Sequence, residues 1–285
     1  MAKKEIDLVI FRFDRQEVWK ALDAAVKRGV RVRTLIAHTN RGGEKNLRKL
    51  EQKLLEVGAT VARTGDEFVR YHGKLMVVDR TDLWLMAFNL TALDTTGSRS
   101  FGVVTRRKAE VADALKLFEA DVTRQPYVPN GSQLVVSPEN ARTMLTDFIK
   151  GARQRLLIYD PKVSDNAIVK LLKDRVKHGV DVRIIGKVGG NAHDLPHEKY
   201  PGKRLHTRAI VRDNRDAFVG SQSLRRLELD NRREAGLIVR SAHIVNELQT
   251  TFEEDWAQTD SGKKHEPKKA EKDVAEQAHD AHVEV

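Results

Sequence analysis

One pattern of polar residues occurs twice in this chain, and this repetition constrains the fold more than any other feature. Each copy has a histidine, a basic residue two positions later and an aspartate seven positions later. The two copies are His72, Lys74 and Asp79, and His206, Arg208 and Asp213. A short apolar run follows in both, and it leads to Asn89 in the first copy and to Ser221 and Ser223 in the second. The pattern predicts two related units that contribute matched halves of one composite site.

Sequence similarity outside the motif supports a duplication. Residues 26–33 recur 150 positions later as residues 176–183, and residues 99–104 recur 134 positions later as residues 233–238. The second unit is therefore 16 residues shorter between these landmarks. A duplicated unit that has lost one segment accounts for all of these matches.

The repeat also sets the predicted domain boundaries. We place the first half at residues 1–126 and the second at residues 132–258, with a linker over 126–131 that contains proline and glycine. Residues 261–285 are mostly Lys, Glu, Ala, Asp and His. Such a segment buries too little apolar surface to fold alone, so we predict a disordered polar tail.

The spacing of apolar residues predicts an α/β fold. Residues 6–13 and 30–36 are rich in β-branched and aromatic side chains, which is typical of strands. Between them lies a helical pattern that Asp14 caps and Gly29 ends. Two strands joined by a helix require a parallel crossover. The second half repeats this order of strand, helix and strand over residues 156–159, 165–177 and 180–185.

Further elements are predicted around the motifs. A second helix of the first half ends at Gly58. Strand pairs that carry the motif are predicted at 74–78 and 83–88, and at 208–211 and 217–220. A helix that Ser137 caps, with Pro138 in its first turn, precedes the second half. The first half begins where its own equivalent of that helix would end, so we expect a missing N-terminal segment, which leaves export or anchoring open.

Composition limits the class of protein and its partners. The 285 residues, 40% of them apolar, suit a soluble globular protein, and no apolar stretch approaches the roughly 20 residues of a spanning helix. There is no cysteine, which excludes disulfides, thiol catalysis and thiolate metal sites. The net charge of +10 fits a polyanionic partner, either nucleic acid or an anionic membrane surface, although a solvated basic surface gives the same value.

The doubled motif resembles that of the phospholipase D superfamily, also called the HKD family, whose pattern is H-x-K-x-x-x-x-D-x-x-x-x-x-x-G-S-x-N. The similarity covers most of the chain. It implies two α/β units related by a pseudo-two-fold axis, each a mostly parallel mixed sheet flanked by helices, with the active site at their interface. It also implies metal-independent phosphodiester chemistry with no cofactor.

The resemblance implies a role for each motif residue. His72 is expected to attack phosphorus and form a phosphohistidine, and His206 to act first as general acid and then as general base. The phosphate oxygens are expected to contact Lys74, Asn89, Arg208 and Ser223, together with Ser221. Histidine suits both tasks because its ordinary pKa lies near neutrality. Side-chain cations take the place of a metal ion.

Three acidic residues have different expected roles. Asp79 and Asp213 occupy the aspartate position of the motif, which is structural in the family. Glu234 follows Ser223 by eleven residues, where the family has a carboxylate that orients an imidazole. Ser100 occupies the equivalent place in the first half. We therefore expect Glu234 to serve His72 and leave His206 less supported.

The motifs depart from the full pattern at four positions. Met86 and Ala87 replace the first Gly-Ser pair, Arg208 replaces the second lysine, and Ser223 replaces the second asparagine. Arginine keeps the charge, but its planar fork differs from a lysine point charge. The lost polar groups suggest reduced or specialised activity.

Three functions are compatible with these residues. The first is a phospholipid phosphodiesterase or phosphatidyltransferase, similar to cardiolipin synthase, which would expose apolar side chains around its cleft. The second is a nuclease, although the aromatic content of 6% provides little surface for stacking bases. The third is a weakly active or inactive phosphate-binding relative. We favour the lipid enzyme, expect a cytoplasmic location and expect a monomer to suffice, because one chain carries both half-sites.

Overall fold

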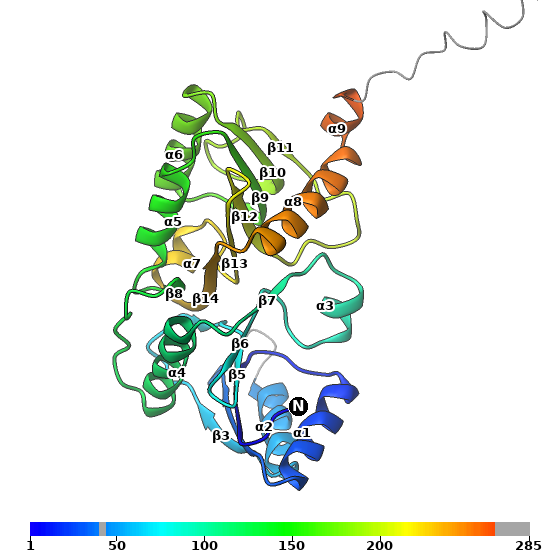
Figure 1. Ribbon diagram of the computed structural model, residues 1–285, viewed down its shortest axis with the longest axis vertical. Coiled ribbons are helices and arrows are strands. Elements are labelled where there is room, and N and C mark those ends of the chain that lie inside the picture. The colour runs from blue at the N-terminus through cyan, green and yellow to red at the C-terminus, as the bar shows by residue number, and fades with distance from the viewer. Residues whose placement is uncertain (40–43, 266–285) are drawn as a thin grey trace, which may run out of the picture.

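The computed structural model describes residues 1–39 and 44–265, which form two mixed β-sheets flanked by helices (Figure 1). The first sheet has the strand order β3-β2-β1-β5-β6-β7. Its strands are β1 (Glu5–Ile10), β2 (Arg31–Ile36), β3 (Thr60–Arg63), β5 (Leu75–Val78), β6 (Asp82–Met86) and β7 (Gly102–Thr105). The helices of this half are α1 (Gln16–Lys27), α2 (Glu44–Glu56), α3 (Ala92–Thr96) and α4 (Lys108–Thr123).

The second sheet has the order β11-β10-β9-β12-β13-β14-β4, and β8 also pairs with β14. Its strands are β4 (Arg70–Tyr71), β8 (Leu134–Ser137), β9 (Arg155–Val163), β10 (Asp181–Val188), β11 (His197–Glu198), β12 (Arg208–Arg212), β13 (Asp216–Gly220) and β14 (Arg232–Val239). The helices are α5 (Ala141–Lys150), α6 (Asn166–Lys177), α7 (Arg226–Asp230), α8 (Ala242–Ala257) and α9 (Asp260–His265). Strand β4 comes from the first half, so the second sheet contains a piece of both halves.

The predicted duplication of an α/β unit is confirmed. The β1-α1-β2 unit recurs as β9-α6-β10 with the same parallel pairing. The antiparallel strands β5-β6-β7 recur as β12-β13-β14, and α4 recurs as α8. In the first sheet the antiparallel pairs outnumber the parallel ones, because the motif strands add antiparallel contacts to the crossover unit.

The apolar core lies in three layers. A central cluster contains inward residues of both sheets together with residues of α4 and α8, such as Phe118 and Phe252. One outer cluster lies between the first sheet and α1 and α2. The other lies between the second sheet and α5 and α6. The shared central cluster makes the two halves one packed unit.

Reciprocal contacts fix the interface between the halves. The Arg233 guanidinium lies 3.1 Å from Asp121, and the Arg99 guanidinium lies 2.7 Å from Asp255. These pairs occupy equivalent positions of the repeat. The same two arginines accept backbone hydrogen bonds from the motif histidines: His72 N donates to the Arg233 carbonyl and His206 N to the Arg99 carbonyl. Each histidine is thus tied to the opposite half.

Three local predictions need correction. Ser137 does not cap a helix: it ends β8, a cis peptide links it to Pro138, and α5 begins at Ala141. Asp14 does not cap α1, because its carboxylate instead accepts a hydrogen bond from Ala92 N. The predicted tail begins inside α9, and its residues from 266 onward lie outside the described residues.

Candidate active site

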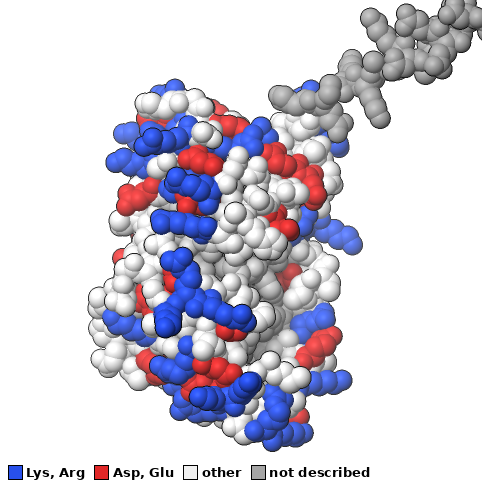
Figure 2. All heavy atoms as spheres, in the orientation of Figure 1, with Lys and Arg blue, Asp and Glu red and all other residues white. Residues whose placement is uncertain are grey.

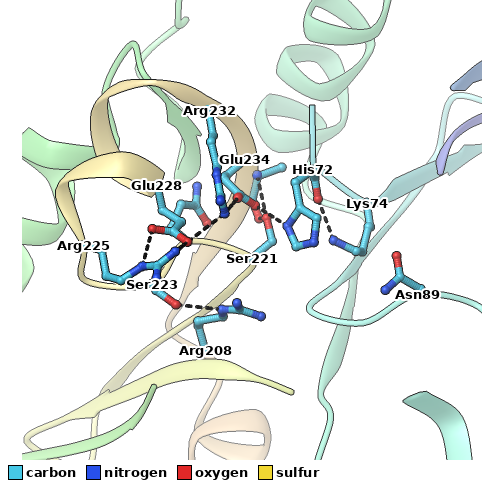
Figure 3. A network of polar contacts seen from close by, with 12 residues as sticks. His72, Lys74, Asn89, Arg208, Ser221, Ser223, Arg225, Glu228, Arg232 and Glu234 are labelled. Carbon is cyan, nitrogen blue, oxygen red and sulfur yellow. Dashed lines mark hydrogen bonds and ion pairs between the residues drawn. The ribbon is translucent and has the colours of Figure 1, made fainter. Parts of the chain in front are cut away.

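The motif residues lie where the two sheets meet. His72 and Lys74 stand between β4 and β5, and Asn89 follows β6. His206 precedes β12, and Ser223 follows β13. Figure 3 shows the side chains of His72, Lys74 and Asn89 across from those of Arg208 and Ser223. The structure therefore brings the residues of both copies to one place.

His72 is buried and bound by the other half. Its Nδ1 atom lies 2.9 Å from Oε2 of Glu234, which β14 provides (Figure 3). The edge of the Phe11 ring packs against it with a centroid distance of 5.1 Å. Burial lowers the pKa of His72 to about 4, against the attraction of Glu234, and the nearby charge of Lys74 lowers it further. His72 is therefore a neutral imidazole near pH 7.

Glu234 is completely buried and remains ionised. Burial alone would raise its pKa, but attraction to His72 and Lys74 and the hydrogen bond from His72 hold that pKa well below its ordinary value. Its second carboxylate oxygen lies 3.8 Å from Nη1 of Arg232. A buried carboxylate without such partners would take up a proton.

Lys74 is also completely buried, and its ammonium donates a 2.6 Å hydrogen bond to the His72 carbonyl. Burial lowers its pKa to about 7, with Glu234 opposing that shift and Arg208 adding to it. A bound phosphate would raise the pKa again, because an opposite charge favours the protonated amine. Lys74 thus provides a desolvated cation that an anion stabilises.

His206 has a carboxylate partner, contrary to the expectation that it is less supported. Its Nδ1 atom lies 3.2 Å from Oδ1 of Asp94, a buried residue of α3 in the opposite half. The same atom lies 2.6 Å from Nη2 of Arg204, and the Arg204 guanidinium also binds Asp94. Burial lowers the pKa of His206, Asp94 opposes that shift, and Arg204 and Arg208 add to it.

The contacts at Nδ1 favour different tautomers of the two neutral rings. A carboxylate can only accept, so Nδ1 of His72 donates to Glu234 and its Nε2 keeps a lone pair. A guanidinium can only donate, so the close Arg204 contact assigns the proton of neutral His206 to Nε2. One ring offers a lone pair and the other a proton.

The two half-sites also hold polar atoms without partners in the described residues. The Arg208 Nε donates to the Ser223 hydroxyl over 3.0 Å, while its buried Nη1 has no partner. Asn89 donates from its amide nitrogen to Asp94 over 2.8 Å, while its Oδ1 has none. Unpaired buried donors are costly, so Arg208 Nη1 is a strong candidate for an anion ligand.

Comparison with known proteins now decides the family. The sequence matches the family described as cardiolipin synthase, PLD-like domain, over residues 1–122 and 145–256. The chain belongs to this family. Its members are part of the phospholipase D superfamily, whose enzymes process phosphodiesters. Comparison with curated proteins finds none that matches.

Two solved structures, the first two below, support the phospholipase D-like fold. Polyphosphate kinase from Porphyromonas gingivalis matches 88% of this chain and 42% of its own length, with 19% identity and a TM-score of 0.72. Phosphatidylserine synthase from Haemophilus influenzae matches 90% of this chain and 81% of its own, with 12% identity and a TM-score of 0.65. Nuc from Salmonella typhimurium, a phospholipase D family member, matches 45% of this chain and 94% of its own, with 20% identity and a TM-score of 0.38.

The aspartates of the phospholipase D motif lie away from this site. The Asp79 carboxylate, at the far end of β5, accepts hydrogen bonds from the backbone nitrogens of residues 3–5. Asp213 does the same for the backbone nitrogens of residues 153–155. Both contacts hold the first strand of a half against the motif hairpin. The structural role of these aspartates stays a prediction, and this geometry fits it.

Ser221 is hydrogen-bonded to the backbone of the residue that follows Glu234. It is completely buried, and its hydroxyl exchanges hydrogen bonds with the backbone of Ala235. These contacts support the strand that carries Glu234. The phosphate-holding role expected of Ser221 is untested, and its position favours a supporting role.

Sequence reasoning missed Asp94 and Arg204. A usable signal existed: Asp94 follows Asn89 by five residues, and Glu228 follows Ser223 by the same interval. An acidic residue therefore recurs five positions after the last residue of each motif copy, outside the motif itself. Among residues 1–39 and 44–265, no three histidine or acidic side chains are grouped to hold a metal ion, and metal-free chemistry stays a prediction.

Proposed function

We propose that this protein is a metal-independent phosphodiesterase that acts on a phospholipid through a phosphohistidine at His72. The observation that carries the proposal is the pair of Nδ1 contacts that hold the two motif histidines, each including a carboxylate of the other half. These contacts leave Nε2 of both rings for the reaction. A nucleophile needs a lone pair, and an acid needs a proton. The two rings meet these needs in one site.

In the first step, Nε2 of His72 attacks phosphorus and the bond to the leaving oxygen breaks. The negative substrate raises the pKa of His206, which takes up a proton from solvent at Nδ1 and becomes an imidazolium. Its Nδ1–H donates a hydrogen bond to Asp94, 3.2 Å away. Its Nε2 proton then passes to the leaving alkoxide. Lys74 and Arg208 balance the charge that develops on the phosphate oxygens.

In the second step, water or an alcohol displaces His72 from phosphorus. His206 has given up its Nε2 proton and keeps its Nδ1 proton, which is hydrogen-bonded to Asp94. Its Nε2 can therefore accept the proton of the attacking hydroxyl. The phosphate leaves bound to that oxygen, and His72 regains its lone pair. Glu234 stabilises the positive charge that His72 carries in the intermediate.

The substrate class is supported by apolar side chains beside both half-sites. Val69 is 71% exposed and precedes β4, which leads to His72. Leu93 is 59% exposed and is the neighbour of Asp94. Exposed apolar groups close in sequence to site residues suit a ligand with acyl chains. On the face in Figure 2, Lys and Arg side chains lie over both halves with Asp and Glu side chains among them.

A substrate panel in excess chelator tests the proposal. The purified protein is incubated with phospholipid vesicles, single-stranded DNA, RNA and bis(p-nitrophenyl) phosphate, beside His72→Ala as control. We expect release of a lipid head group or its transfer to an added alcohol. Cleavage of nucleic acid alone would replace the lipid proposal with a nuclease, and loss of all turnover on chelation would overturn the metal-free mechanism.

A further inference from the structure

The outer faces of the two sheets are made of equivalent residues but are covered differently. In the second half, α5 packs on this face, and Leu145, Phe148 and Ile149 of α5 share a buried cluster with Phe218 and Ile238. The equivalents of Phe218 and Ile238 in the first half are Trp84 and Val104. Phe218 is 1% exposed and Ile238 is 8% exposed, whereas Trp84 and Val104 are each 42% exposed.

The uncovered face forms an apolar groove beside α1. Two adjoining cavities of 410 and 660 Å³ share four lining residues, Val18, Leu22, Met76 and Trp84. We call this the α1 groove. It lies at the place that α5 fills in the other half, where the equivalent residues Ile168, Leu172, Ile210 and Phe218 are all buried.

Among the described residues, no strand pairs with the outer edge of the sheet beside this groove. In the second half, β8 pairs with β14 over Glu234 to Leu237, and every residue of β14 is buried. The equivalent strand β7 is the last strand of its sheet, and exposed residues alternate along it. An edge strand beside an apolar face offers both main-chain hydrogen bonds and a hydrophobic surface.

We propose that the α1 groove and the β7 edge bind a partner polypeptide as a strand followed by an amphipathic helix. The second half of the same molecule provides the template, since β8 and α5 cover the equivalent surface in that form (Figure 1). The partner helix carries large aliphatic or aromatic residues at positions i, i+3 and i+4, as Leu145, Phe148 and Ile149 do in α5. This inference does not depend on the catalytic proposal.

A synthetic peptide of residues 132–151, which spans β8 and α5, is the probe. Labelled peptide is titrated with the full chain, and binding is followed by fluorescence anisotropy. We expect saturable binding that weakens at least roughly tenfold in Trp84→Asp and in Val104→Asp, because a buried aromatic anchor typically dominates such an interface. Val128→Asp is the matched control, because Val128 is 61% exposed and does not line the α1 groove.

Two controls and measurements of dimerisation and vesicle binding separate a peptide-binding groove from a dimer interface or a lipid-binding surface. A peptide with Leu145→Asp and Phe148→Asp should not bind, and melting curves should show that all protein variants are folded. Binding that Trp84→Asp does not weaken would mean that the peptide exchanges with the resident α5, and this would overturn the proposal. If the protein dimerises and Trp84→Asp abolishes the dimer, the groove binds a second copy instead. If the protein binds vesicles but not the peptide, and Trp84→Asp abolishes vesicle binding, the groove binds lipid instead.

Discussion

The two half-sites share a frame but hold their histidines differently. His72 has one partner at Nδ1, the carboxylate of Glu234, which can only accept a proton. His206 has two partners at Nδ1, Arg204 and Asp94, of which one donates and the other accepts. The first arrangement fixes one tautomer of the ring. The second can hold both a neutral ring and an imidazolium, which suits a group that must give and then take a proton.

The difference comes from how the duplicated acids are used. Asp94 and Glu228 occupy equivalent positions of the repeat, but Glu228 pairs with Arg225 and Arg232 instead of a histidine (Figure 3). Glu234 and Ser100 are also equivalent, and Ser100 donates to the Asp94 carbonyl. The backbone frame is thus symmetric, while the charges around the two rings are not. This asymmetry distinguishes nucleophile from acid.

The largest expected effect is the loss of turnover on replacing the motif histidines. Its dependence on the leaving group should distinguish His72 from His206. His72→Ala should lower turnover by roughly 10⁴-fold or more with every substrate, because no group replaces the nucleophile. His206→Ala should cost about 10²-fold to 10⁴-fold with an alkyl ester. With a p-nitrophenyl ester, whose leaving group needs no proton, the first step should change by less than about tenfold. Single-turnover release of p-nitrophenol measures this step.

The covalent intermediate provides a second readout of the same comparison. His206→Ala should accumulate an acid-labile phosphoprotein because its second step lacks a base, and His72→Ala should form none. Mass spectrometry of peptides quenched at alkaline pH detects the adduct. If His72→Ala instead forms a phosphoprotein at His206, then His206 is the nucleophile and His72 the general acid.

The supporting acids should show a smaller effect in the same direction. Glu234→Gln should lower the rate by roughly 10³-fold, because an amide cannot stabilise the positive ring that forms at His72. Asp94→Asn should cost less, about 10²-fold, and only with alkyl leaving groups, since Arg204 still holds the neutral His206 ring. Equal losses in both variants with both leaving groups would remove the asymmetry between the two half-sites.

The sequence was sufficient for the fold and for one contact of the candidate site. The repeat located β1-α1-β2, its copy and the motif strands, because apolar spacing and glycine positions are local signals. It also paired Glu234 with His72, as the 2.9 Å contact now shows. Asp94 escaped because a short helix brings it to His206 across the interface, and no local pattern encodes that approach. The uncovered Trp84 likewise became visible only when its environment was compared with that of Phe218.

Stability should fall as the pH falls, because both histidines are buried as neutral rings. In the folded protein the pKa of His72 is about 4 and that of His206 is also lowered. As the pH falls, the same histidines of the unfolded chain take up protons earlier, near their ordinary pKa of about 6.5. Between about pH 6.5 and 4, each ring should reduce the free energy of unfolding by about 1.4 kcal/mol per pH unit. Urea unfolding at several pH values measures this slope.

Removing either ring tests the origin of that slope. His72→Asn and His206→Asn should each remove about one histidine's share of the pH dependence. An unchanged slope in His72→Asn would mean that the ring is protonated in the folded protein at low pH. That result would also contradict its assignment as the neutral nucleophile.

The smallest expected effect concerns the two motif aspartates, where the halves should behave alike. Asp79→Ala and Asp213→Ala each remove hydrogen bonds to three successive backbone nitrogens, at a residue with positive φ that alanine tolerates poorly. Each should cost about 1 kcal/mol after allowance for solvent screening, which lowers the melting temperature by about 2–4 °C. The Asn variants should recover part of this loss, because asparagine accepts hydrogen bonds and adopts positive φ. Turnover of folded protein should stay within about twofold, since both residues lie at the end of the motif strands opposite to Lys74 and Arg208. A hundredfold loss of turnover without a change in melting would give these aspartates a catalytic role in place of a structural one.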